Sequence, residues 1–132
     1  MNRKSWRVGL AVAVFGLVVL SRTWAEEAKP ADDGKAEDFK GKTFDLKEKG
    51  EGSVTLTFPG GKLATVTVKS EKKSDVNLFV YDINKKVLTK DDSPGPDCEV
   101  SFQPMGAVKL TLVVRNRGPG ENRSTLKVKI GR

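Results

Sequence analysis

Four oxygen-bearing side chains are the residues in this sequence best suited to binding a metal. Asp75 and Asn77 open the stretch SDVNLFVYD, and Asp91 and Asp92 directly precede the loop SPGP. Carboxylate and amide oxygens are the ligands that Ca²⁺ takes in proteins, about six to eight of them per ion. These four residues are therefore candidate calcium ligands. Further acids on their N-terminal side could complete such a shell: Glu26, Glu27, Asp32 and Asp33.

The same aspartates have a simpler alternative role in the backbone. Asp75 and Asp82 bracket an alternating apolar segment that reads as a strand. Aspartate is rare inside strands and frequent in turns, because its side chain bonds nearby backbone N–H groups. Neither an EF-hand loop nor a glycine–aspartate repeat is present. Ending strands and binding calcium therefore remain open as alternative roles.

Other catalytic or metal chemistry has little support in the sequence. Histidine is absent, which removes the usual general base and the commonest transition-metal ligand. Cys98 is the only cysteine, so thiolate metal sites and an intrachain disulfide are excluded. Ser70 and Lys73 match a serine-x-x-lysine pattern, but that pattern needs a helix and this one lies in a charged turn. We expect no enzymatic activity and no resident cofactor other than calcium.

Two sets of side chains are candidates for binding a partner. Lys109 on one expected strand and Lys127 and Lys129 on the next would form one basic patch if those strands pair as a hairpin. Such a patch suits an anionic polymer, although lysine on exposed strands also simply keeps sheets soluble. Phe79 and Tyr81 face away from the expected core. They either form a contact surface or lie under another part of the chain.

The elements that position these residues are strands. From Phe39 onward, apolar residues alternate with Thr, Lys and Glu, and turn residues such as Pro59-Gly60-Gly61 separate the runs. The pattern predicts about eight strands and no helix, in an all-β antiparallel β-sandwich that is jelly-roll-like. A short strand is expected at Val87 and Leu88. The inward residues expected on the other strands are Phe44, Leu46; Val54, Leu56, Phe58; Ala64, Val66, Val68; Leu78, Val80; Cys98, Val100, Phe102; Val108, Leu110, Leu112, Val114; and Leu126, Val128, Ile130.

The N-terminal part of the chain has a different composition. Basic residues precede an unbroken run of 13 apolar residues, 8–20, and a small-residue site ends at Ala25. This order is typical of a secretory signal peptide over residues 1–25, with an uncleaved membrane anchor as the alternative. Residues 26–38 are acidic and lack large apolar side chains, so a flexible acidic tether is expected before a domain at 39–132. The mature protein would be secreted or periplasmic.

Two stretches resemble a known family. SDVNLFVYDINKKV resembles the central motif of the bacterial pre-peptidase C-terminal domains, in which an aspartate pair precedes alternating leucine and aromatic residues and a turn. VSFQPMGAVKLTLVVRN is similar to that family's closing pattern of a glycine followed by a strand. The resemblance covers residues 40–130. It departs from the motif at Asn77, which replaces the second acid, and at Asn84-Lys85, where the family favours glycine.

The resemblance implies a secreted, non-catalytic β-sandwich module of the kind often attached to exported enzymes. Such domains are similar to clostridial collagen-binding modules, some of which bind calcium. For this chain it implies a binding or scaffolding role toward a surface polysaccharide, another anionic polymer or a protein partner, with a calcium-stabilised adhesion domain as the alternative. Binding to nucleic acid is not expected, because no aromatic-rich basic signature accompanies the lysines. After signal cleavage, no contact with a membrane is expected.

Overall fold

The computed structural model describes residues 32–131, and the expected signal peptide lies outside them. The described part is all-β, as predicted, with one short 3-10 helix, η1 (Ala36–Asp38). Among the described residues, no helix has the length and apolarity needed to cross a membrane. The strands are β2 (Lys42–Leu46), β3 (Glu51–Phe58), β4 (Ala64–Ser70), β5 (Val76–Tyr81), β6 (Val87–Asp91), β7 (Cys98–Phe102), β8 (Val108–Asn116) and β9 (Asn122–Ile130).

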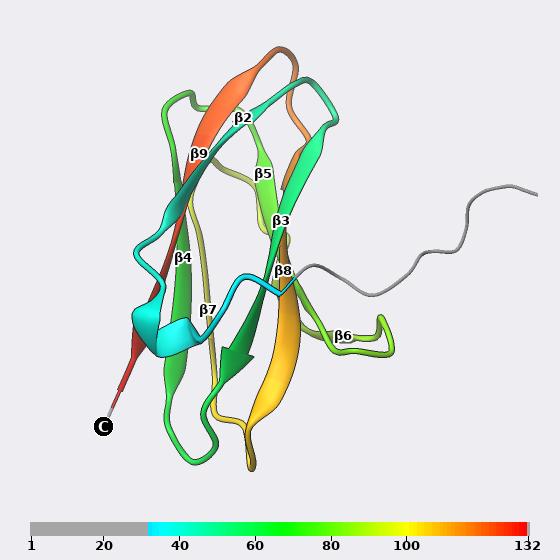
Figure 1. The fold of residues 1–132 in the computed structure, drawn as a ribbon. Helices are drawn as coiled ribbons and strands as arrows, with labels where there is room; N and C mark the ends of the chain where they lie inside the picture. Colours follow the sequence, from blue (N-terminus) through cyan, green and yellow to red (C-terminus); the bar gives the residue numbers. More distant parts are fainter. Residues whose placement is uncertain (1–31, 132) are drawn as a thin grey trace, which may run out of the picture. The chain divides into compact units, whose positions relative to one another are not determined.

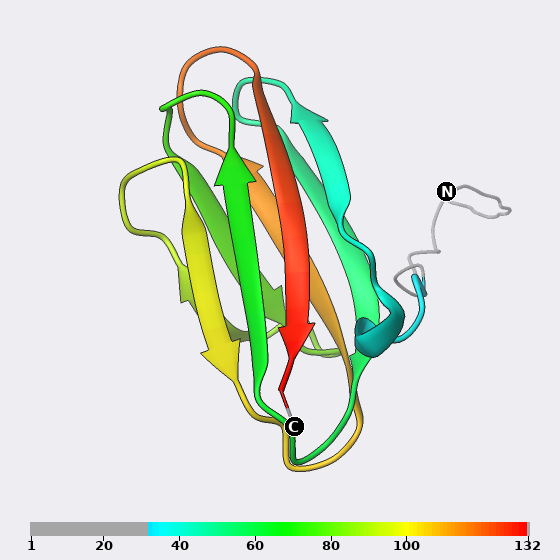
Figure 2. The same ribbon diagram turned by 90° about the vertical axis from the view of Figure 1, so that its left-hand side faces the viewer.

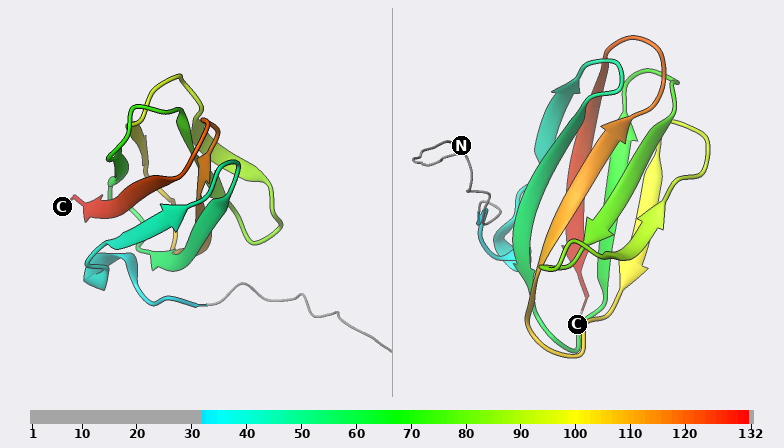
Figure 3. Two further views of the ribbon diagram at one scale, coloured as in Figure 1. Left: turned by 90° about the horizontal axis from the view of Figure 1, so that it is seen from above. Right: turned by 90° about the vertical axis from the view of Figure 1, so that its right-hand side faces the viewer.

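The strands form two four-stranded antiparallel sheets that pack face to face (Figures 1 and 2). Sheet I has the order β2-β9-β4-β7, and sheet II has the order β3-β8-β5-β6. The pairs β2–β9, β3–β8, β4–β7 and β5–β6 are those of one long hairpin wound around a core, which is the jelly-roll connection. The expected jelly-roll sandwich is therefore confirmed, and Figure 3 shows both layers from above and sheet II from outside.

The core lies between the sheets and follows the alternation of the sequence. Successive strand residues point to opposite faces, so every second residue enters the core. Phe58, Leu78 and Leu112 have no exposed surface, and the rings of Phe58 and Phe102 meet edge to face with centroids 5.1 Å apart. Cys98 is buried among these residues, as its position in the pattern predicted.

Two buried asparagines fix the loops at one end of the sandwich. Asn116, at the end of β8, donates from Nδ2 to the carbonyl oxygens of Lys47 and Gly120 (3.2 and 2.8 Å) and accepts from the N–H of Gly118 (3.1 Å). Asn122, at the start of β9, exchanges hydrogen bonds with the N–H and C=O of Lys72 (2.9 and 3.1 Å). Both side chains therefore form hydrogen bonds with backbone groups that strand pairing does not satisfy. Together they join three turns.

The segment before β2 differs from the flexible tether expected over residues 26–38. Residues 26–31 lie outside the described residues, but 32–38 are held against the sandwich. The N–H of Asp33 donates to Thr55 O (2.8 Å), its carboxylate accepts from Thr55 N (2.8 Å), and Lys35 bridges to Thr57 in parallel. Ala36 is buried. These residues form hydrogen bonds with β3, which would otherwise be an open sheet edge. The bonds order this segment, although its composition predicted a flexible tether.

Candidate binding surfaces

Phe79 and Tyr81 form an aromatic pair on the outer face of sheet II. They alternate along β5 with Leu78 and Val80, which enter the core, so strand geometry places both rings outside. Their ring centroids are 6.0 Å apart and the rings are inclined by 27°. Both side chains are half-buried. The outward position expected from the sequence is therefore confirmed.

Neighbouring strands extend the pair into a platform. Arg115 of β8 places its guanidinium carbon 5.0 Å from the centre of the Phe79 ring, within the range of a cation–π contact. Val113 lies opposite Phe79, and Thr111 lies opposite Tyr81. We call Phe79, Tyr81, Thr111, Val113 and Arg115 the aromatic platform. Aromatic, arginine and small apolar or hydroxyl side chains on a regular sheet face give a surface with little conformational entropy to lose on binding.

The charges around the aromatic platform compensate one another. Three basic side chains on this face each have an acidic partner: Arg115 Nε lies 3.0 Å from Glu51, Lys90 Nζ 3.1 Å from Asp92, and Lys109 Nζ 3.2 Å from Asp32. These ion pairs are exposed and contribute little to stability. They do remove the excess positive charge that an anionic polymer would need, so the platform is nearly neutral.

The basic patch expected from Lys109, Lys127 and Lys129 does not form. It required β8 and β9 to pair, but β8 lies between β3 and β5 in sheet II, and β9 lies between β2 and β4 in sheet I. In the jelly-roll topology, the loop between β8 and β9 carries the chain from one sheet to the other. Lys109 therefore faces outward on one side of the molecule, and Lys127 and Lys129 face outward on the other.

On the outer face of sheet I, lysines are interspersed with threonines and acidic residues. Lys127 lies opposite Thr67, which lies opposite Glu99, and Lys129 lies opposite Thr65, so threonines separate the charges. On this face Lys69 pairs with Asp97 (3.6 Å) and Arg123 pairs with Asp45 (2.6 Å), whereas Lys127 and Lys129 have no ion-pair partner among the described residues. Lysine dispersed in this way suits a soluble sheet face better than a polymer site.

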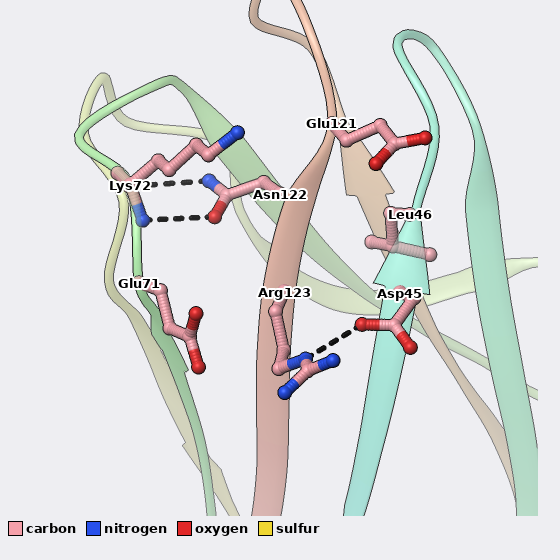
Figure 4. A pocket seen from close by; sticks show the side chains of 7 residues that line it. All are labelled: Asp45, Leu46, Glu71, Lys72, Glu121, Asn122 and Arg123. Carbon is pink, nitrogen blue, oxygen red and sulfur yellow. Dashed lines mark hydrogen bonds and ion pairs between the residues drawn. The ribbon is translucent and has the colours of Figure 1, made fainter.

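An open polar pocket of about 500 Å³ lies at one end of sheet I (Figure 4). Arg123 stands between Asp45 and Glu71, and its Nε donates to Asp45 at 2.6 Å. That hydrogen bond and the neighbouring carboxylates raise the pKa of the Arg123 guanidinium. The side chain of Asn122, on the pocket wall, forms hydrogen bonds with Lys72 and Ser74. Asn122 thus holds the β4–β5 turn, and the Arg123–Asp45 pair joins β9 to β2.

Asp82 and Asp91 serve the backbone, and Asp92 forms an ion pair. Asp82 Oδ1 accepts from the N–H groups of Asn84 and Lys86 (2.8 and 2.9 Å), and so shapes the β5–β6 turn around Lys85, whose φ is 65°. Asp91 accepts from Ser93 and from the N–H of Glu99 (2.9 Å). Burial opposes ionisation of Asp91, but these hydrogen bonds outweigh it and lower its pKa. Asp92 pairs with Lys90.

In contrast to these aspartates, Asp75 and Asn77 each have an unsatisfied side-chain oxygen. Oδ1 of Asp75 and Oδ1 of Asn77 are buried and have no hydrogen-bond partner in the structure, and Asn77 as a whole is 3% exposed. Buried acceptors are normally satisfied, so an unpaired one marks a place where a donor or a cation would be stabilised. Within residues 32–131, however, no group of three or more Cys, Asp or Glu side chains is arranged to hold a metal ion.

Cys98 is protected from reaction. Its Sγ donates to Val76 O at 3.0 Å. Burial, with the nearby carboxylates of Asp91, Asp75 and Asp97, raises the pKa of the thiol to about 12. Since the thiolate is the nucleophile, a thiol with so high a pKa is inert at neutral pH.

We expect Ellman's reagent at pH 8 to leave native Cys98 unreacted for an hour and to label it fully in guanidinium chloride. The folded state also holds this proton more tightly than the unfolded state, where the thiol has its ordinary value of 9.0. Its contribution to stability is therefore complete below about pH 9 and is lost as the pH rises toward 12. Rapid labelling of the native protein, or a disulfide-linked dimer on a non-reducing gel, would contradict this.

Comparisons with known proteins find similarity of structure and not of sequence. No family model matches the sequence, and no curated protein matches it. The structure is similar to the pre-peptidase C-terminal domain of a collagenase from Bacillus anthracis, with a TM-score of 0.57 and 17% identity, covering 74% of this chain and 92% of that domain.

Two further solved structures have lower TM-scores. A de novo designed double-stranded β-helix has a TM-score of 0.43 and 11% identity, covering 69% of this chain and all of that one. The periplasmic inhibitor of g-type lysozyme from Aeromonas hydrophila has a TM-score of 0.39 and 18% identity, covering 76% of this chain and 99% of that one. The likeness to the collagenase domain confirms the expected kind of fold. The described part of the chain has the β-sandwich fold of a pre-peptidase C-terminal domain.

Proposed function

We propose that this chain is an exported, non-catalytic binding module whose contact surface is the aromatic platform of sheet II. The arrangement of residues 1–25 supports export, as does the occurrence of a similar domain in a bacterial collagenase. A non-catalytic role agrees with the absence of histidine and with the inert Cys98. The observation that carries the proposal is the Phe79–Tyr81 pair with Arg115 above it.

The composition of the aromatic platform favours a protein partner over an anionic polymer. Tyrosine, phenylalanine and arginine are enriched at the centres of protein interfaces, with charged pairs at the rim. Glu51, Asp92 and Asp32 neutralise the cations of this face, so electrostatic attraction to a polyanion would be weak. The collagenase origin of the similar domain makes collagen the first protein polymer to test, with hyaluronate as the polysaccharide comparison.

Replacing both Phe79 and Tyr81 with alanine should reduce retention on insoluble collagen by about 100-fold, because interface aromatics each contribute about 1–2 kcal/mol. Co-sedimentation at increasing collagen concentration measures this. Replacement of Lys127 and Lys129 by glutamate, on the opposite sheet, is the matched control and should change nothing. Equal retention of the wild type and the alanine variant would remove the platform from consideration, and retention on hyaluronate alone would make the partner a polysaccharide.

A calcium-stabilised adhesion domain is the second candidate, and the unpartnered oxygens of Asp75 and Asn77 favour it. A site there predicts a melting temperature that rises with calcium concentration and returns to its starting value with excess chelator, because a ligand of the native state stabilises by mass action. Asn77→Ala should abolish the rise, whereas Asp92→Ala, in an exposed ion pair, should preserve it. A melting temperature independent of calcium would leave Asp75 and Asn77 without a metal role.

A further inference from the structure

We propose that the end of the sandwich formed by the β3–β4, β5–β6 and β7–β8 turns docks onto an anionic phospholipid bilayer. In the part of the chain that the structure describes, all five exposed large apolar residues lie on these turns or next to them. Leu63 (49% exposed) follows the first turn. Ile83 (67%), Val87 (49%) and Leu88 (53%) belong to the β5–β6 hairpin, and Met105 (101%) lies on the β7–β8 loop. Exposed apolar residues gathered in this way mark an interaction site.

Two of these turns are fastened to each other, which gives the apolar residues a firm base. The N–H of Gly61 donates to Pro104 O at 2.7 Å, and Gln103 Nε2 donates to Gly61 O at 3.3 Å. Gly60 lies so close to Gly106 that an added Cβ would come within 2.5 Å of its Cα. Leu63 and Met105 are therefore carried by tightly packed backbone.

A shallow apolar groove joins the third turn to this base. It has a volume of about 360 Å³, and its walls include Leu88, Pro104, Met105 and Ala107, with Asp82 at its margin. The β5–β6 hairpin and the β7–β8 loop thus share one apolar surface. In Figure 1 the β7–β8 loop lies at the lower end of the sandwich and the β5–β6 hairpin projects from its side above that end, both away from the loops at the upper end.

The charge on these three turns is positive, with three lysines and one aspartate. Lys62, Lys85 and Lys86 are exposed on the same turns, and none of them has an ion-pair partner within residues 32–131. The acid among them, Asp82, uses its carboxylate to bond the N–H groups of Asn84 and Lys86. The opposite end mixes acids and bases, including Glu48, Lys72 and Glu121, and has no exposed large apolar side chain among the described residues.

Apolar loop tips with adjacent lysines match the chemistry of an anionic membrane interface. The apolar side chains enter the boundary between headgroups and acyl chains, and the lysines meet lipid phosphates. Association of two copies through this end is less favourable, because a two-fold axis would bring the same lysine-bearing turns together. The sequence predicted no membrane contact after signal cleavage. The apolar and basic residues of these turns are spread over positions 62 to 105, and only the fold brings them together.

An environment-sensitive fluorophore at the loop tip tests the proposal in the full chain. Met105→Cys is labelled with an NBD dye under native conditions, where Cys98 is buried. Adding vesicles of phosphatidylcholine and phosphatidylglycerol should shift its emission to the blue and make it quenchable by spin-labelled lipid. The same label at Glu121→Cys, on the opposite end, should not respond. Because the signal comes from the tip, membrane association through another part of the chain does not imitate it.

Two variants in the labelled protein extend the test. Lys62→Glu with Lys86→Glu should lower the vesicle affinity reported by position 105 by about tenfold or more, and Leu63→Ser with Leu88→Ser should do likewise. An unchanged spectrum at position 105 with anionic vesicles would overturn the proposal, as would equal shifts at positions 105 and 121. A shift that grows with protein concentration without vesicles would overturn it too, and would assign this end to a second copy.

Discussion

Replacing Asn116 with alanine is expected to lower the free energy of unfolding by about 3 kcal/mol. The side chain has no exposed surface and bonds backbone groups of two loops: Lys47 in the β2–β3 turn, and Gly118 and Gly120 in the β8–β9 loop. Alanine removes these hydrogen bonds and leaves their backbone partners short of one, in a place that water reaches poorly. For a domain of about 100 residues, such a loss lowers the melting temperature by about 15 °C.

Thermal melts followed by circular dichroism check this prediction, with Arg117→Ala as the matched control. Arg117 is the next residue and is exposed, and the hydrogen bond that it contributes to this end comes from its backbone N–H, to Asp75 O. Its substitution should therefore shift the melt by less than about 3 °C. A similar small shift for Asn116→Ala would show that the loops at this end do not depend on the asparagine.

The second large effect is expected at Phe58, which has no exposed surface and packs against Phe102. Phe58→Ala should lower the free energy of unfolding by about 3–5 kcal/mol, through lost burial and the cavity left behind. The same substitution at Phe79 should cost about 1 kcal/mol, because that ring lies on the outer face and contacts chiefly Tyr81 and Arg115. Urea titrations of the two variants measure both values.

This comparison also separates a structural role of the aromatic platform from a binding role. If Phe79→Ala leaves the fold intact, a loss of collagen retention in the Phe79 and Tyr81 variant reports on the contact surface. If instead Phe79→Ala destabilises the protein as much as Phe58→Ala does, the outer ring is part of the structure. The assignment of the platform as a binding surface would then fail.

Much of the fold could be predicted from the sequence because one face of each strand is buried. Alternation with period two identified the inward residues from Phe44 to Ile130, and the turn residues between them separated the strands. What local pattern does not contain is the partner of each strand. The basic patch depended on pairing of β8 with β9, and that pairing does not occur, because their loop crosses between sheets and places Lys109 and Lys127 on opposite faces.

The candidate sites, too, could be predicted only where they depend on a single strand. The outward position of Phe79 and Tyr81 follows from alternation within one strand, so it could be predicted. The contact between Phe79 and Arg115 joins residues 36 positions apart in the sequence and needs the β5–β8 pairing. Asn116 and Asn122 resemble ordinary turn asparagines in the sequence, and their burial depends on three loops that meet only in the folded chain. Residues 32–35 look disordered by composition, yet they bond to the edge of β3.

The most direct test of the account is an NMR titration of the isotope-labelled protein with a triple-helical collagen peptide. Binding through the aromatic platform predicts chemical-shift changes centred on Phe79, Tyr81, Val113 and Arg115, with none at Thr67 or Lys127 on the opposite sheet. Changes centred on sheet I, or an unperturbed spectrum at peptide concentrations well above those that retain the protein on collagen, would contradict the proposed binding surface.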